Sequence, residues 1–263
     1  MLSTSAHQFD YDPAQKRITG LHIDQDRMLT ADTFVSTLPF DRLAKISPPA
    51  LLQSDQRLQG IGSIQVSPII GIHLVFATPD ESPIMDLPHL VVTGSMIQWL
   101  FNKGMVDHQE EASASPVHET LPSPTTRGQH LHAVISAAHK EVGVGADELI
   151  AQAVREVKSL FPKARQATLL HGRVVKEKRA TFSARPGFHR YRAAASPNRS
   201  KGDAVNLYLA GDWCQTGWPA TMEGAVRSGY LAAQGLLRDL GHDALLLTPD
   251  LPASPLYQFL AGE

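Results

Sequence analysis

Residues 206–237, NLYLAGDWCQTGWPATMEGAVRSGYLAAQGLL, decide the fold. This segment begins as a short apolar strand, continues through a loop with two glycines at 211–219, and ends as a helix. Pro219 has the fixed backbone φ that suits the first turn of that helix. The first part of one helix face is small, which lets a sheet or a cofactor approach closely. The residues of this face are Ala225, Val226, Gly229, Ala232, Ala233, Leu236 and Leu237.

The loop carries the groups that a sugar-containing cofactor needs. Gly211 lets the backbone turn where a bound ligand would crowd a side chain. Asp212, at the carboxyl end of the strand, can accept hydrogen bonds from ribose or ribityl hydroxyls. The backbone N–H groups after Pro219 have no partner inside the helix, so they can stabilise negative charge on a bound ring. A reduced flavin carries such a charge at its pyrimidine edge.

Leu-Ala-Gly-Asp-Trp at 209–213, followed by Pro-Ala-Thr-Met-Glu-Gly-Ala-Val-Arg-Ser-Gly at 219–229, resembles a known motif. It is similar to the C-terminal FAD-binding motif of the amine-oxidase and phytoene-desaturase superfamily. Within that group, residues 98–103, 176–182, 212–213 and 216–219 resemble the squalene-associated FAD-dependent desaturases, the hydroxysqualene dehydroxylases.

The resemblance implies that FAD is the cofactor. Gly211 and Asp212 would meet its ribityl–pyrophosphate region, and Met222 with its neighbours would meet the isoalloxazine through backbone groups. The residues expected to bind the cofactor are Gly211, Asp212, Trp213, Pro219, Ala220, Thr221, Met222 and Glu223. A role for Arg227 is left open, and no catalytic residue is assigned.

The expected fold is α/β, a partial Rossmann-like FAD-binding domain with an inserted α+β substrate domain. Residues 1–45 and 203–240 would form the first, residues 46–202 the second, and 241–263 an irregular tail. Short strands are predicted at 7–11, 18–23, 28–30 and 206–210, a strand buried on both faces at 33–38, and an amphipathic helix at 147–161. Residues 108–129, rich in Glu, Ser, Thr and Pro, are predicted to be a mobile surface insertion.

Members of this superfamily begin with a strand, a Gly-x-Gly-x-x-Gly turn and a helix that hold the ADP pyrophosphate. This sequence does not begin that way. Gly143-Val144-Gly145 lacks the third glycine, because Glu148 stands in its place. The resemblance is therefore to a family member without its first half, and a separately encoded N-terminal half is an expected partner.

The resemblance implies an oxidoreductase of polyprenoid lipids, first of all one that converts hydroxysqualene to squalene in hopanoid biosynthesis. A carotenoid desaturase or isomerase is a second interpretation, and a non-catalytic remnant or subunit a third. Trp99, Phe101 and Trp218 are candidates for a substrate pocket, although aromatic residues more often serve as plain core.

Composition excludes several other classes. A formal net charge of −2 offers no basic field for nucleic acid. The single cysteine, Cys214, rules out an internal disulfide framework and is interpreted as a small buried filler. Twelve histidines include no His-Glu-x-x-His spacing, so no metal is expected.

Neither a signal peptide nor a long apolar run is present, so the expected location is cytoplasmic, with a peripheral contact at the inner face of the membrane compatible with a lipid substrate. The basic run Arg173, Lys176, Lys178 and Arg179 is predicted to be a solvated strand face; the alternative is contact with a diphosphate or an anionic membrane.

Overall fold

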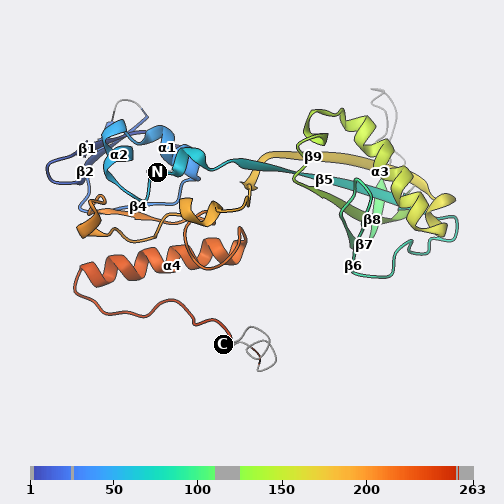
Figure 1. Ribbon diagram of the computed structural model, residues 1–263. Helices are drawn as coiled ribbons and strands as arrows, with labels where there is room; N and C mark the ends of the chain where they lie inside the picture. The colour runs from blue at the N-terminus through green and yellow to red at the C-terminus, as the bar shows by residue number, and fades with distance from the viewer. Residues whose placement is uncertain (1–2, 25–26, 110–124, 253, 255–263) are drawn as a thin grey trace, which may run out of the picture. The chain divides into compact units, whose positions relative to one another are not determined.

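The computed structural model describes residues 3–24, 27–109, 125–252 and 254, and the chain divides into two compact units (Figure 1). Unit 1 comprises residues 1–65 and 184–263, and unit 2 comprises residues 66–183. The sequence prediction placed its domain boundaries at 45/46 and 202/203, whereas the compact units divide at 65/66 and 183/184. The long antiparallel strands at the two ends of unit 2 pair from their first residues, so the division falls where they begin and end. That unit 1 holds the cofactor and unit 2 the substrate stays a prediction.

Unit 1 begins with three of the predicted short strands, β1 (Ala6–Asp12), β2 (Arg17–Ile23) and β3 (Arg27–Leu29), which form an antiparallel meander. Alternate residues of this sheet face the core: Phe9, Ile18 and Ile23 are buried, whereas the residues next to them in the strands are polar. The short helices α1 (Phe40–Ile46) and α2 (Pro49–Ser54) and the 3-10 turn η1 (Ile61–Ser63) follow later in the same segment.

A second, two-stranded sheet joins the two ends of the chain in unit 1. β4 (Phe34–Ser36) pairs in parallel with β10 (Leu207–Leu209). All of β10 is buried, but Val35 of β4 is 49 % exposed, so the prediction of a strand buried on both faces is wrong for β4. Among the described residues only β10 pairs with β4. Parallel strands are ordinarily covered on both faces, so the exposure of Val35 is unusual for a strand of this kind.

The C-terminal segment of unit 1 adds η4 (Phe188–Tyr191), η5 (Arg199–Lys201) and the helix α4 (Met222–Asp239). α4 packs beside β10, and Figure 1 shows it running below this sheet. Residues 241–252 contain neither helix nor strand.

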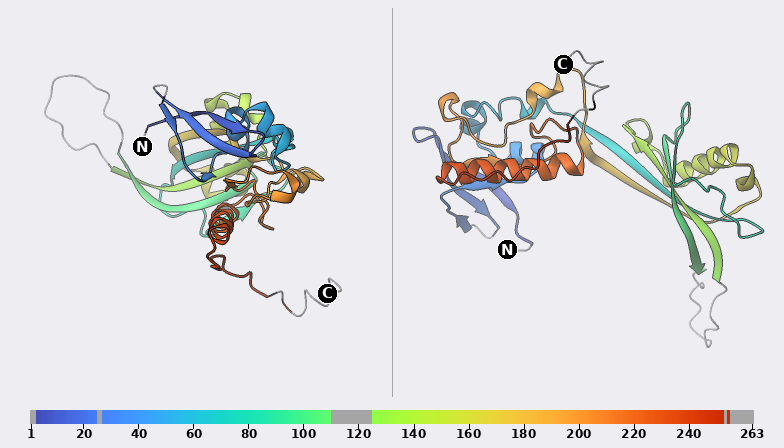
Figure 2. Two further views of the ribbon diagram at one scale, coloured as in Figure 1. Left: turned by 90° about the vertical axis from the view of Figure 1, so that its left-hand side faces the viewer. Right: turned by 90° about the horizontal axis from the view of Figure 1, so that it is seen from below.

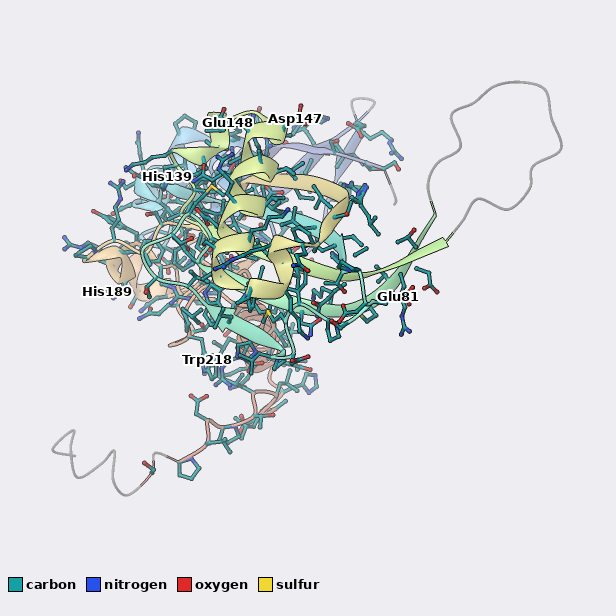
Figure 3. All side chains as sticks on the ribbon, turned by 90° about the vertical axis from the view of Figure 1, so that its right-hand side faces the viewer. Glu81, His139, Asp147, Glu148, His189 and Trp218 are labelled. Carbon is teal, nitrogen blue, oxygen red and sulfur yellow. The ribbon has the colours of Figure 1, made fainter. Side chains whose placement is uncertain are left out.

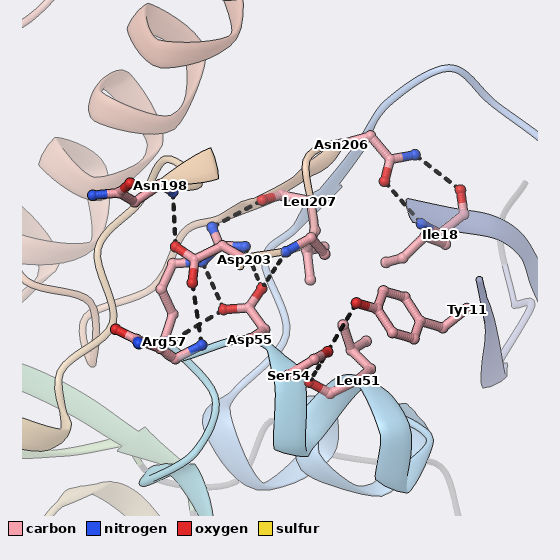
Figure 4. A network of polar contacts seen from close by, with 12 residues as sticks. Tyr11, Ile18, Leu51, Ser54, Asp55, Arg57, Asn198, Asp203, Asn206 and Leu207 are labelled. Carbon is pink, nitrogen blue, oxygen red and sulfur yellow. Dashed lines mark hydrogen bonds and ion pairs between the residues drawn. The ribbon is translucent and has the colours of Figure 1, made fainter. Parts of the chain in front are cut away.

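A buried polar network ties the two segments of unit 1 together (Figure 4). The guanidinium of Arg57 donates to both carboxylate oxygens of Asp55, at 3.0 and 2.6 Å, and to the carbonyl oxygen of Leu207 at 2.9 Å. Asp55 also accepts from the backbone N–H of Ala204 at 3.0 Å, and Asp203 lies 3.5 Å from the guanidinium. This network fixes the start of β10 against residues 55–57.

Unit 2 is a five-stranded antiparallel sheet in the order β6-β7-β8-β5-β9. The strands are β5 (Val66–Ala77), β6 (His89–Val91), β7 (Trp99–Gln109), β8 (Thr125–Ser136) and β9 (Thr168–Phe182). The 3-10 turns η2 (Glu141–Gly143) and η3 (Pro162–Arg165) flank the helix α3 (Ala146–Leu160), which confirms the predicted amphipathic helix.

α3 covers one face of this sheet (Figures 1 and 2). It buries Leu149, Ala153 and Val157 against alternate strand residues such as Ile72 and Leu74. Asp147 and Glu148 lie in its first turn, where negative charge is favourable, and their side chains point outward in Figure 3.

The predicted mobile insertion at 108–129 falls mainly on residues 110–124, outside the described residues. The two ends of the predicted insertion are strand residues and not a mobile loop, because residues 105–109 of β7 pair with residues 125–129 of β8. Gln129 explains part of the difference: its side chain is buried and accepts from the N–H groups of Ile84 and Met85 at 2.8 and 3.0 Å. The polar composition of the segment did not reveal that Gln129 forms hydrogen bonds inside the core.

Candidate cofactor site

The loop after β10 is held by contacts with α4 and by packing within the loop itself. Gly211 has a φ of +154°, and its N–H donates to the Oγ of the buried Ser228 at 2.7 Å. A Cβ added at Gly211 would lie 2.5 Å from Nε1 of Trp213. The glycine therefore makes room for the indole of Trp213, in addition to any ligand that the sequence prediction invoked.

Trp213 belongs to the core. Its side chain is 1 % exposed and its indole N–H donates to the carbonyl oxygen of Leu38 at 3.2 Å. The indole is thus used inside unit 1, and a contact between Trp213 and the cofactor stays a prediction that would involve its backbone. Cys214 beside it is also buried, and burial raises the pKa of its thiol to about 12, in agreement with a filler.

Asp212, the second residue of this loop, is half-buried. Burial raises the pKa of its carboxyl above the usual value, although the backbone N–H of Trp213 and the charge of Arg192 act in the opposite direction. A carboxylate in this position gains from hydroxyl donors, which would replace the water it has lost. The chemistry of Asp212 therefore fits the sugar-like hydroxyls of FAD.

Arg192, which follows η4, fastens the loop from the side. Its guanidinium donates to the carbonyl oxygens of Trp218 at 2.6 Å and Asp212 at 2.9 Å, and it reaches Thr216 Oγ1 at 3.5 Å. One side chain thus holds both ends of residues 212–218. The sequence prediction missed Arg192, because an isolated arginine in an irregular segment gives no signal of its target.

The N-terminus of α4 lies later than predicted. Thr221 is the N-cap and its Oγ1 accepts from the N–H of Gly224 at 3.0 Å, so Pro219 and Ala220 lie in the loop and not in the first helical turn. The N–H groups of Met222 and Glu223 fall at the positions that lack an intrahelical acceptor. They and the loop ahead of them are available to a negatively charged ring edge.

The buried face of α4 also differs from the predicted one. It consists of Gly224, Arg227, Ser228, Ala232 and Gly235. At Gly235 a Cβ would come within 1.8 Å of Ser196 Oγ, whereas a Cβ at Gly229 would meet nothing within 4 Å, so a neighbouring segment approaches closely at Gly235. Met222, Val226 and Tyr230 lie on the opposite side and are 89, 55 and 48 % exposed.

Trp218 sits over the start of α4. Its ring lies 5.6 Å from the guanidinium carbon of Arg227, and its indole N–H donates to Asp250 at 3.1 Å. Arg227 also meets Glu223 at 3.4 Å and Asp250 at 3.2 Å. Arg227 and Glu223 therefore stabilise the start of the helix and pin residue 250 of the tail to it.

The other two residues of the predicted substrate pocket lie in unit 2. Trp99 and Phe101 stack with ring centroids 5.8 Å apart and an interplanar angle of 7°. Trp218 belongs to unit 1, so a pocket that unites all three residues stays a prediction.

A buried strand, a glycine and an acidic residue at its end, and a capped helix behind them define a protein that binds a nucleotide-like cofactor. The chain belongs to the family of flavin containing amine oxidoreductases, whose model matches residues 2–237. This confirms the expected superfamily, its partial α/β fold and a flavin cofactor of the FAD type.

Individual relatives agree with the family. The chain is 28 % identical over 226 residues to 15-cis-phytoene desaturase of Synechococcus elongatus, covering 84 % of this chain and 43 % of that protein. It is 29 % identical over 228 residues to hydroxysqualene dehydroxylase of Rhodopseudomonas palustris, covering 86 % and 44 %. The chain thus spans less than half the length of these curated relatives.

Solved structures share the fold. A putative protoporphyrinogen oxidase from Exiguobacterium sp. 255-15 aligns with a TM-score of 0.59 at 12 % identity, covering 91 % of this chain and 47 % of the other. In the described part of the chain, no helix is long and apolar enough to cross a membrane, and no three potential ligands gather as a metal site.

Proposed function

We propose that this chain is the C-terminal part of an FAD-dependent oxidoreductase that acts on a polyprenoid or triterpenoid lipid. The observation that carries the proposal is the arrangement of Asp212 and the N-terminus of α4 on either side of one loop, which Arg192 and Ser228 hold in place. Relatives named hydroxysqualene dehydroxylase and 15-cis-phytoene desaturase support a long, apolar substrate.

The particular reaction we propose is conversion of hydroxysqualene to squalene, as in hopanoid biosynthesis. Replacing a hydroxyl by hydrogen consumes a hydride and a proton and releases water, and reduced FAD, when bound, supplies the hydride. The chain's own contribution is to hold the cofactor. Asp212 would accept its hydroxyl hydrogen bonds, and the N–H groups of Met222 and Glu223 would face its ring edge.

A carotenoid desaturase or isomerase is the second candidate. It is favoured by the phytoene desaturase relative, which matches over almost the same length as the hydroxysqualene dehydroxylase and at nearly the same identity. The two reactions run in opposite redox directions, because desaturation removes a hydride and a proton from the chain while dehydroxylation adds them.

We further propose that a complementary half, which carries the pyrophosphate-binding turn, completes the cofactor site. Met222, Val226 and Tyr230 repeat at intervals of four residues and form an exposed apolar stripe along α4. Val35 is exposed on the parallel pair β4–β10 as well. Apolar surface of this kind is typical of a face that another element covers.

Product analysis separates these functions. The chain together with its complementary half, loaded with FAD, would be incubated anaerobically with hydroxysqualene and dithionite, or aerobically with phytoene and a quinone acceptor. We expect squalene from the first mixture. A new conjugated product from the second alone would favour the desaturase, and no product from either would identify a non-catalytic remnant or subunit.

A further inference from the structure

A row of side chains crosses all five strands of the unit 2 sheet on the face opposite α3. In register order it runs from His89 through Phe101, His132 and His73 to Arg173. Residues in a strand alternate between the two faces, and the flanking Ile72 and Leu74 belong to the core beneath α3. Four steps between strands make the row roughly 19 Å long.

The rings of this row touch one another in sequence. His89 and Phe101 have centroids 6.3 Å apart, Phe101 and His132 are separated by 6.2 Å, and His132 stacks on His73 at 4.2 Å with an interplanar angle of 5°. Gly71 permits this stack, since a Cβ there would lie 2.7 Å from Nε2 of His132. The result is a row of neighbouring rings, in which His132 and His73 are stacked and the other pairs are tilted.

A parallel row beside it is apolar. It runs through Val91, Trp99, Val134, Gly71 and Val175 in register. Val91, Trp99 and Val175 are exposed in unit 2, and Trp99 stacks on Phe101 of the first row. The second row and the rings of the first together form an elongated surface whose apolar part is made by Val91, Trp99, Phe101 and Val175, and exposed apolar surface of this kind marks a binding site.

One end of the rows is cationic. A pocket of about 380 Å³ lies there, lined by His73, Val75, His130, His171, Arg173 and Val175. Nδ1 of His73 lies 3.0 Å from Nε2 of His130, and the charges of Arg173, Lys103 and His171 lie near the imidazoles. Within the described ranges, neither Arg173 nor Lys103 forms an ion pair with a carboxylate.

The electrostatics of this pocket leave it short of negative charge. Burial, followed by the charges of Arg173 and Lys103, lowers the pKa of His73, and burial with the neighbouring imidazole of His73 lowers the pKa of His130. Lys176 follows the pocket residue Val175 and, as its neighbour in the strand, faces the other side of the sheet; its ammonium donates to the carbonyl oxygens of Val142 and Val144. Arg173 is therefore the member of the basic run that is directed into the pocket.

We propose that this face of unit 2 binds a single-chain amphiphile, with its apolar chain along the two rows and a phosphate or diphosphate head in the pocket at Arg173. A guanidinium offers paired donors that match phosphate oxygens, and imidazole N–H groups add further donors. Flat rings and valines give an extended chain a matching apolar bed. Every residue of the proposed site belongs to unit 2.

Calorimetric titration of the full chain tests this proposal with three probes: pyrophosphate for the head, farnesol for the chain, and farnesyl diphosphate for both. We expect farnesyl diphosphate to bind at least tenfold more tightly than either part alone. Arg173→Gln should weaken binding of pyrophosphate and farnesyl diphosphate roughly tenfold but leave farnesol unchanged. Arg155→Gln, on the exposed side of α3, is the matched control and should change none of them.

A second measurement uses sulfate, which keeps its charge between pH 5.5 and 8. Its affinity should rise as pH falls, because a bound anion favours the protonated forms of His73, His130 and His132 beside Arg173 and Lys103. His171 lines the same pocket, and His89 is at the far end of the row. His73→Gln should flatten this dependence, whereas His139→Gln near α3 (Figure 3) should not.

Three results would overturn the proposal. Equal affinity for pyrophosphate and farnesyl diphosphate would remove the role of the two rows. Binding that Arg173→Gln leaves intact would remove the pocket. Cosedimentation with anionic phospholipid vesicles, without binding of monomeric farnesyl diphosphate, would assign the face to a membrane surface instead.

Discussion

Replacement of Arg57 by methionine tests whether the buried network holds unit 1 together. Methionine keeps much of the apolar stem but removes the guanidinium, which contacts Asp55, Asp203 and the carbonyl oxygen of Leu207, and leaves only the backbone donors to the two carboxylates. Both carboxylates are almost fully buried, and breaking a buried ion pair from one side costs about 3–5 kcal/mol. We expect Arg57→Met to lose that much free energy of unfolding at pH 7.

The loss should depend on pH in a defined direction. Burial, together with the negative charge of Asp55, raises the pKa of Asp203 in the folded protein, while Arg57 acts against this rise. A carboxyl with a raised folded-state pKa binds a proton more readily than in the unfolded chain, so its contribution to stability falls as pH rises through that pKa. Without Arg57 the pKa of Asp203 rises further, so acidification from pH 7 to pH 5 should recover part of the loss.

Urea unfolding followed by circular dichroism at both pH values measures these effects. Arg42→Met is the matched control, because its side chain is 56 % exposed and 3.8 Å from Asp41; it should cost less than about 1 kcal/mol. A loss below about 1 kcal/mol in Arg57→Met, or an equal loss at pH 5 and pH 7, would refute the reasoning.

Three further predictions concern single side chains. Gly211→Ala places a Cβ 2.5 Å from the indole of Trp213 and should cost about 1–3 kcal/mol in urea unfolding. The control Gly217→Ala has nothing within 4 Å of the new Cβ and should be destabilised only by its φ of +79°, so a larger loss at Gly217 would contradict the prediction. Thr221→Ala removes the cap of α4 and should cost about 1 kcal/mol, which Thr221→Ser should largely restore; equal stability of both variants would remove the cap from the account. Burial, followed by nearby positive charges, lowers the pKa of His132 to about 4, so the urea midpoint should fall as pH drops from 6.5 toward 4, and His132→Phe should flatten that dependence; an unchanged pH profile in the variant would refute it.

The strand, loop and helix that carry the proposed site could be predicted because their signals are local. Apolar spacing located β10 and α4, and the glycine and aspartate marked the loop between them. The exact start of α4 could not be read, since Pro219 and Thr221 are both good helix-start residues and only the hydrogen bond from Gly224 to Thr221 decides between them.

Contacts between distant segments were beyond sequence reasoning. Arg57 and Leu207 are 150 residues apart, and the guanidinium of Arg192 donates to the backbone carbonyl oxygen of Asp212, an acceptor that any residue would offer. The row from His89 to Arg173 depends on the register of five strands, which a composition of twelve histidines does not reveal. Long-range register is set by the packing of the whole sheet.

We propose that the loop at Asp212 and the start of α4 hold the flavin. The most direct test is the visible spectrum of the chain with its complementary half after FAD is added and unbound flavin is removed, with Asp212→Ala compared with the exposed control Asp243→Ala. We predict stoichiometric flavin bands for the unchanged protein and for Asp243→Ala, and at least a roughly tenfold weaker affinity for Asp212→Ala with an unchanged far-ultraviolet spectrum. Full flavin retention by Asp212→Ala, or no flavin in any sample, would contradict the claim.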